Sequence, residues 1–205
     1  MADQKKLDAG ENQLKRLLAA ADKLEIIDLS SNYMRGLDRL DGNLERSVFW
    51  DDAYCSYGTY EGGPEGFVEY CQSALKSHLS NHHFLGQINI EIENNEAFGE
   101  VYYQAFHRTK DANDNQRDVF ISGRYVDRYE KRDGIWRIAY RSELVDWVRD
   151  DPAADTWFKN SPMILGARKP KDPLCEYGMG PNYIFCRCTY RVTVDLSVRD
   201  RKSVV

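Results

Sequence analysis

Apolar side chains in the first part of the chain recur with the period of a helix. From Leu24 to Leu40, leucine, isoleucine and methionine residues follow one another at steps of three and four, which predicts a helix. Asp22 followed by Glu25 has the spacing of a capping box, whose side chains accept hydrogen bonds at a helix start. We therefore expect this helix to begin at about residue 22 and to end at Asp41.

Two shorter helices are expected next. The first carries the apolar residues Leu44, Val48 and Phe49. A glycine-rich stretch follows it and predicts a loop. Pro64 suits the first turn of a third helix, because its missing amide would lack a partner there in any case, and this helix runs to about His78.

The middle of the chain changes to a period of two. Ile88, Ile90 and Ile92 alternate with polar residues, which predicts a strand that ends in a turn at Glu93-Asn94-Asn95. Three further strands are expected at 99–108, 119–129 and 135–148, the last two joined by the hairpin turn KRDG. Helices followed by consecutive hairpin-linked strands indicate an α+β domain, not the alternation of strand and helix that builds a parallel sheet.

The chain past Asp150 has a less regular pattern. Five prolines interrupt it, so we expect it to wrap the domain surface. Every second residue from Ile184 to Val198 is apolar, which predicts a half-buried strand, either at a sheet edge or docked on a neighbouring subunit. The expected organisation is an extension over residues 1–21, a domain over 22–150 and a C-terminal extension over 151–205.

Composition and charge argue against several classes of protein. The 205 residues are 42% apolar and carry a net charge of −5, with 28 basic residues interspersed among 33 acidic ones, which disfavours binding to nucleic acid. No apolar run approaches the ~20 residues of a membrane span, and the polar N-terminus is unlike a signal peptide. Five cysteines without a repeating framework favour a reducing compartment. We expect a cytoplasmic protein with neither nucleic acid nor membrane as a partner.

Few residues suggest metal or cofactor chemistry. The sequence lacks a glycine-rich phosphate loop, a GxSxG elbow and an HExxH motif. Cys186 and Cys188 have the wrong spacing for a zinc knuckle and lack a second pair. His82 and His83 are adjacent on an extended segment, so their side chains point to opposite faces and at most one of them faces a given site. We expect no metal.

The region from Ile26 to Arg141 resembles the SnoaL-like superfamily of nuclear-transport-factor-2-like proteins. Its closest likeness is to the group that contains lindane dehydrochlorinase, scytalone dehydratase and bile-acid 7α-dehydratase. The segments that carry the likeness are IIDLSSNYMRGLD (26–38), FWDDA (49–53), GTYEGGPEG (58–66), HFLGQINIEI (83–92) and DRYEKRDGIWRIAYR (127–141). The resemblance implies a cystatin-like α+β cone, in which N-terminal helices pack in a curved, mostly antiparallel sheet around a deep pocket.

The resemblance also implies the catalytic residues. The family's catalytic histidine falls on His83 and its paired aspartate on Asp38. Tyr33 stands five residues before that aspartate, where the dehydratases carry tyrosine and the dehydrochlorinase carries lysine. An arginine late in the last strand matches Arg141. Tyrosine in place of lysine favours an oxygen leaving group or an enolate over the departure of chloride.

Further residues fall where the family lines its pocket. Four of them are Tyr57, Tyr103, Ile121 and Tyr125. His107 is a candidate counterpart of the second histidine that scytalone dehydratase uses. In some relatives a C-terminal segment closes the pocket, and the adjacent residues Trp157 and Phe158 are candidates for that role here, although plain surface packing explains them as well.

These residues suit proton transfer without a cofactor. An imidazole accepts a proton near neutral pH, and a buried carboxylate fixes its tautomer and stabilises the imidazolium. A tyrosine hydroxyl and an arginine then support negative charge on an oxygen or leaving group. We therefore predict a cofactor-independent lyase of dehydratase type, which acts on a fairly apolar, hydroxylated cyclic substrate.

Two alternatives stay open. An isomerase that moves a proton along an enolate would use the same base and oxyanion support. A non-catalytic role, as a binding module or an accessory subunit, would also be consistent with the fold, because the small subunit of ring-hydroxylating dioxygenases shares it. In each case the resemblance implies a closed homo-oligomer, with a trimer preferred over a dimer.

Overall fold

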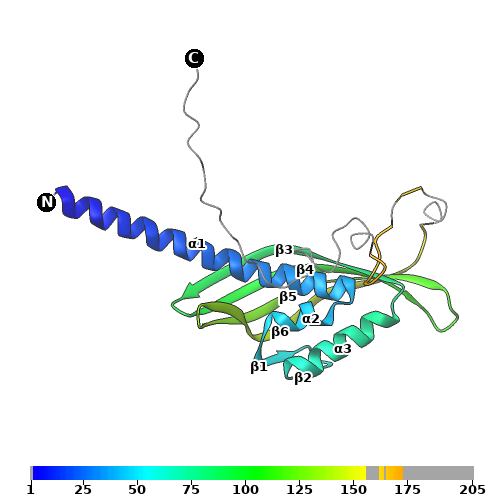
Figure 1. The fold of residues 1–205 in the computed structure, drawn as a ribbon. Coiled ribbons are helices and arrows are strands. Elements are labelled where there is room, and N and C mark those ends of the chain that lie inside the picture. Colours follow the sequence, from blue (N-terminus) through cyan, green and yellow to red (C-terminus); the bar gives the residue numbers. More distant parts are fainter. Residues whose placement is uncertain (1, 156–161, 164, 173–205) are drawn as a thin grey trace, which may run out of the picture.

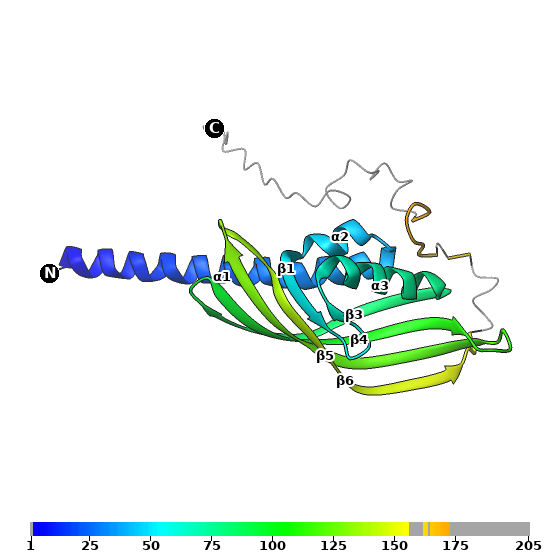
Figure 2. The ribbon, with the colours of Figure 1, turned by 90° about the horizontal axis from the view of Figure 1, so that it is seen from below.

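In the described part of the chain, one curved sheet carries three helices on its concave face (Figure 1; Figure 2). The computed structural model describes residues 2–155, 162–163 and 165–172. The elements, in chain order, are α1 (Ala2–Arg39), α2 (Gly42–Ser47), β1 (Phe49–Ser56), β2 (Glu61–Gly62), α3 (Pro64–Ser77), β3 (Ser80–Glu93), β4 (Glu96–Lys110), β5 (Gln116–Arg132) and β6 (Ile135–Pro152). This arrangement confirms the predicted α+β class.

The sheet is mostly antiparallel, as expected. Its strand order is β2-β1-β6-β5-β4-β3, and only the pairing of β1 with β6 is parallel. The strands β3 to β6 are joined by successive hairpins, which the alternating pattern and the turn residues predicted. At the turn between β5 and β6, Asp133 and Gly134 both have positive φ, 52° and 80°, as a two-residue hairpin turn of type I′ requires.

The predicted start of the first helix is wrong. Helix α1 runs without a break from Ala2, so Asp22 lies in its middle and caps nothing. The Asp22 carboxylate instead accepts a hydrogen bond from the Lys131 ammonium at 2.5 Å. Residues 9–21 are rich in alanine, leucine and long polar side chains, which all favour helix, and this part of α1 extends beyond the sheet (Figure 1). Its leucines are exposed in consequence, as at Leu14 and Leu18.

The assignment of Phe49 to a helix is also wrong. Helix α2 ends at Ser47, and Phe49 opens strand β1, where it pairs with Ile138. A central strand needs apolar side chains on its covered face, and Phe49, Ala53 and Cys55 on β1 are all buried. The glycine-rich stretch contains the two-residue strand β2, and α3 starts at Pro64 as predicted.

Part of the C-terminal extension packs on the domain. The backbone amide of Lys169 donates to the Arg39 carbonyl at 3.2 Å, and the Arg39 guanidinium donates to the Ala167 carbonyl at 2.9 Å. The predicted strand at 184–198 and the pair Trp157 and Phe158 lie outside the described residues. None of the described helices has the length and apolarity that crossing a membrane requires.

A carboxyl group is buried where α2 packs on α1. The two helices touch because Gly36 has no side chain; a Cβ there would lie 2.8 Å from the backbone nitrogen of Glu45. The Glu45 side chain is fully buried, and one of its oxygens accepts a hydrogen bond from the Gln72 amide at 2.5 Å. Burial raises the pKa of Glu45 to about 8, although Gln72 and Cys71 oppose this shift.

We expect Glu45→Gln to flatten the pH dependence of stability. A free glutamate has a pKa near 4.5, so between about pH 5 and 8 the folded protein holds a proton that the unfolded chain has lost. The free energy of unfolding therefore falls as pH rises through this window, by roughly 5 kcal/mol at most. Glutamine keeps the acceptor for Gln72 and does not titrate. Urea unfolding across this range measures the slope, and the exposed Glu69→Gln on α3 is the control. Parallel slopes for the wild type and Glu45→Gln would contradict the prediction.

Candidate functional site

Asp38 and His83 meet where the last turn of α1 lies against the start of β3. The Nδ1 atom of His83 is 2.8 Å from the Asp38 carboxylate, and the backbone amide of His83 donates to both carboxylate oxygens at 3.0 and 3.1 Å. The two side chains are only 6% and 8% exposed. A carboxylate can only accept hydrogen bonds, so Nδ1 carries the proton and the lone pair of Nε2 is available to accept one.

Asn81 supplies a further donor to this carboxylate. Its side-chain amide donates to the Asp38 carboxylate at 3.0 Å and to the Leu37 carbonyl at 3.3 Å, while its carbonyl oxygen accepts from Arg168. Asn81 lies two residues before His83 on β3 and therefore points to the same face of the sheet. The spacing of two residues between Asn81 and His83 is visible in the sequence, but it indicates a shared face only when the strand is known to begin at Ser80.

The two neighbouring histidines differ in their surroundings, as predicted. His82 is exposed, whereas the His83 side chain is buried on the opposite face. His107 on β4 is buried, and its ring centroid lies 5.2 Å from that of His83 and 4.9 Å from that of His78. Burial, with the neighbouring His83 and His78, lowers the pKa of His107 to about 3, so this ring is neutral beside the Asp38–His83 pair.

A second group of predicted residues gathers around Arg141. Its guanidinium lies between the rings of Tyr33 and Tyr125, 4.3 Å from each centroid, and pairs with the Asp127 carboxylate through bonds of 2.8 and 2.7 Å. The Tyr33 and Tyr57 hydroxyls are 2.9 Å apart. Burial works against the charge of Arg141, but the Asp127 carboxylate raises the pKa of Arg141 well above its usual range. The Arg141 guanidinium therefore stays protonated, and the Asp127 carboxylate balances its charge.

Tyr103 and Glu143 lie on the same face of the sheet as Arg141. The ring of Tyr103 stacks on Tyr125 with centroids 4.6 Å apart, and its hydroxyl donates to the Glu143 carboxylate at 2.6 Å. Burial raises the pKa of Glu143, against the effects of Tyr103, His83 and Arg141. Sequence reasoning missed Glu143, although its position two residues after Arg141 on β6 indicates a shared face. Ile121, also predicted for the pocket, is half-buried between Ala105 and Val148 in the same sheet.

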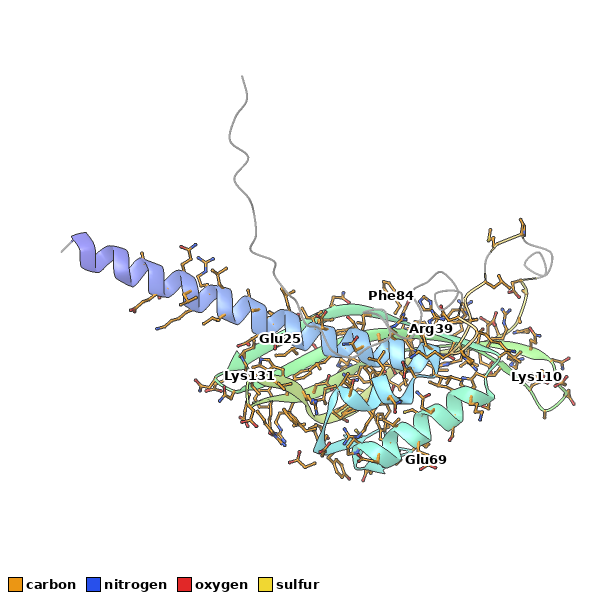
Figure 3. The ribbon with its side chains drawn as sticks, viewed as in Figure 1. Glu25, Arg39, Glu69, Phe84, Lys110 and Lys131 are labelled. Carbon is orange, nitrogen blue, oxygen red and sulfur yellow. The ribbon has the colours of Figure 1, made fainter. Side chains whose placement is uncertain are left out.

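A surface cleft of about 340 Å³ between α1 and β3 reaches Asp38 and His83. Two residues that line it, Arg39 and Phe84, are labelled near the C-terminal end of α1 in Figure 3. The residues that line the cleft are Ser31, Met34, Arg35, Asp38, Arg39, His83, Phe84 and Leu85. The structure thus brings the predicted residues together in two groups. The cleft reaches the Asp38–His83 group, and the tyrosines with Arg141 fill the interior beside it.

The described residues offer no set of ligands for a metal ion. No group of three or more histidine, cysteine, aspartate or glutamate side chains is placed there to hold a metal ion. Cys55 and Cys71 are free thiols, and burial raises the pKa of Cys55 to about 12, which keeps that thiol protonated. Cys186 and Cys188 lie outside the described residues.

Comparison with known proteins places the chain in a family. Residues 19–142 match the model of the SnoaL-like domain. Hexachlorocyclohexane dehydrochlorinase 1 of Sphingobium indicum is 25% identical over 126 residues, which cover 58% of this chain and 78% of that enzyme.

Solved structures confirm the predicted fold. A type 2 hexachlorocyclohexane dehydrochlorinase superposes with a TM-score of 0.60 at 22% identity, over 73% of this chain and 99% of that one. A scytalone-dehydratase-like protein of Novosphingobium aromaticivorans gives a TM-score of 0.59 at 19% identity, over 66% and 91% of the two chains. At these identities the superpositions establish a shared fold.

We expect Asp127→Asn to destabilise the protein strongly. The Asp127 and Arg141 side chains are both 0% exposed, so the substitution leaves a buried guanidinium without its counter-charge. Breaking such a pair costs about 3–5 kcal/mol. The urea midpoint of unfolding measures the loss. Asp146→Asn is the matched control, because Asp146 pairs with Arg124 between the same two strands at 2.7 Å but at the surface, and we expect little change. Equal stability of the wild type and Asp127→Asn would refute the prediction.

Proposed function

The chain belongs to the family of SnoaL-like domains, and we propose that it is a cofactor-independent lyase of dehydratase type. It removes a proton and a small leaving group from a fairly apolar cyclic substrate. The observation that carries the proposal is the buried contact of His83 with Asp38 at the end of an open cleft. The named dehydrochlorinase relatives support a cyclic, apolar substrate, because hexachlorocyclohexane is one.

His83 acts as the general base. Its Nε2 lone pair takes a proton from carbon, and the electrons of that C–H bond form the new double bond as the C–O bond of the leaving hydroxyl breaks. The proton that His83 has taken passes to the leaving hydroxyl, which departs as water and leaves His83 neutral for the next turnover. Asp38, through its 2.8 Å contact with Nδ1, stabilises the imidazolium that forms at His83.

Tyr33 and Arg141 provide the electrophilic support. Burial raises the pKa of Tyr33 well above its usual range, so its hydroxyl stays protonated and can donate. The Nη1 group of Arg141 is buried without a hydrogen-bond partner in the described part of the chain. In this proposal, Nη1 is the donor for negative charge that develops on an oxygen of the substrate. Tyr57, Tyr103, His107, Ile121 and Tyr125 complete the pocket in this proposal.

The same base and donors would also serve an isomerase that moves a proton without losing a group. The two reactions differ in mass balance. A lyase yields a product lighter by the leaving group, whereas an isomerase yields a product of unchanged mass. Mass spectrometry of the product therefore distinguishes them.

We expect His83→Ala to abolish turnover. Positioned proton transfer contributes about 10²–10⁴-fold, so kcat should fall by at least two orders of magnitude. The assay is a screen of hydroxylated cyclic compounds by mass spectrometry with the wild type, followed by kinetics of the variants on any substrate found. Asp38→Asn should reduce kcat as well, because the charge that stabilises the imidazolium is lost.

The neighbouring His82→Ala is the matched control. His82 is exposed on the opposite face of β3, so its replacement should leave kcat unchanged. Circular dichroism establishes that each variant is folded. Full activity of folded His83→Ala would exclude His83 as the base and remove the proposed mechanism.

A further inference from the structure

We propose that Arg168 is a positioning residue for the Asp38–His83 pair and that it acts through Asn81. Arg168 belongs to the segment 165–172, far from both residues in the sequence. The reaction that it would assist rests on the proposed function. Its effect on the geometry of the pair does not, and a measurement without substrate tests that effect.

Arg168 contacts the start of β3 and the end of α3 with its two terminal nitrogens. One donates to the side-chain carbonyl of Asn81, and the other donates to the backbone carbonyl of His78 at 3.0 Å. Arg168, Asn81 and Asp38 all line one groove of about 720 Å³ between this segment and the end of α1. The guanidinium is planar and presents its donors in a fixed fork, so two anchored donors set its orientation.

The orientation of the Asn81 amide follows from these contacts. Its NH₂ group has two donors, which reach the Leu37 carbonyl and the Asp38 carboxylate at 3.3 and 3.0 Å. Its carbonyl oxygen is occupied by Arg168. Each end of the amide therefore has its partners, and rotation by 180° would bring the carbonyl against two acceptors and the NH₂ group against a cation. Arg168 thus holds the NH₂ group toward Asp38.

The same carboxylate oxygen receives both Asn81 and the ring of His83. Because Arg168 fixes the Asn81 amide, the hydrogen bond from Asn81 keeps the Asp38 carboxylate in place. Asp38 in turn fixes the tautomer of His83. Loss of Arg168 leaves the Asn81 carbonyl, which is buried, without that donor. The amide then gains freedom, and the hydrogen bond that orders Asp38 weakens.

Lys169 gives a matched comparison in the same segment. Its ammonium contacts the Asp41 carboxylate, and its backbone amide contacts the Arg39 carbonyl, so it docks the segment 165–172 on the end of α1. A purely structural role of the segment would make Lys169→Met and Arg168→Met equivalent. If Arg168 positions Asn81, only Arg168→Met should change the Asp38–His83 pair.

The experiment is nuclear magnetic resonance of the ¹⁵N-labelled, unliganded full chain. In Arg168→Met, we expect the side-chain NH₂ signals of Asn81 to shift and the two ring nitrogens of His83 to move toward each other as both tautomers become populated. In Lys169→Met, both sets of signals should stay at their wild-type positions. Arg168→Lys keeps the charge but lacks the fork, so the Asn81 signals should move there too, and this variant carries the test if Arg168→Met does not fold.

Kinetics add a second readout once a substrate is known. We expect Arg168→Met to lower kcat about tenfold with KM nearly unchanged, as for a residue that orients a catalytic group. Unchanged Asn81 and His83 signals in Arg168→Met, or equal changes in Lys169→Met, would overturn the proposal. If the signals respond as expected but His83→Ala keeps full activity, the positioning by Arg168 stands and the proposed function fails.

Discussion

The Asp38 carboxylate is the group on which the site and the packing of α1 both depend. It is a buried charge, and a buried carboxylate is tolerated only when donors surround it. Those donors are the His83 backbone amide, the His83 ring and the Asn81 amide, all from β3. The bonds that satisfy the charge therefore also fasten the end of α1 to the sheet. A change that loosens this helix would move the proposed base as well.

A second buried charge organises the interior. Arg141 is neutralised by Asp127 and enclosed by the rings of Tyr33 and Tyr125. These contacts give a permanent cation a dry environment, where its field is screened less than in water. Tyr103 on β4 donates to Glu143 on β6, two residues after Arg141, and this bond spans β5 on the same face of the sheet.

Local patterns predicted local structure, and contacts between distant segments escaped them. Alternating residues and turn residues predicted the hairpins of β3 to β6, and Pro64 predicted the start of α3. The start of α1 was missed because the capping pattern at Asp22 lies within a run of good helix formers, and such a run continues through the pattern as one helix. Asp38 and His83 followed from resemblance to a family, and in the structure the two side chains are in contact. Arg168 meets Asn81 across 87 residues, and no sequence pattern announces such a contact.

The residue at position 33 argues for the dehydratase form of the proposal. In the dehydrochlorinase that this chain resembles, a lysine is expected there, and its full charge suits a departing halide. Tyr33 offers a neutral hydroxyl, because burial raises the pKa of this phenol well above its usual range and keeps it protonated. Its neighbours are aromatic rings, the Arg141 guanidinium and the Tyr57 hydroxyl, and the pair of hydroxyls provides hydrogen bonds suited to a leaving oxygen. Under the proposed function, the chain therefore uses His83 as its base and carries at position 33 a group that suits a leaving oxygen.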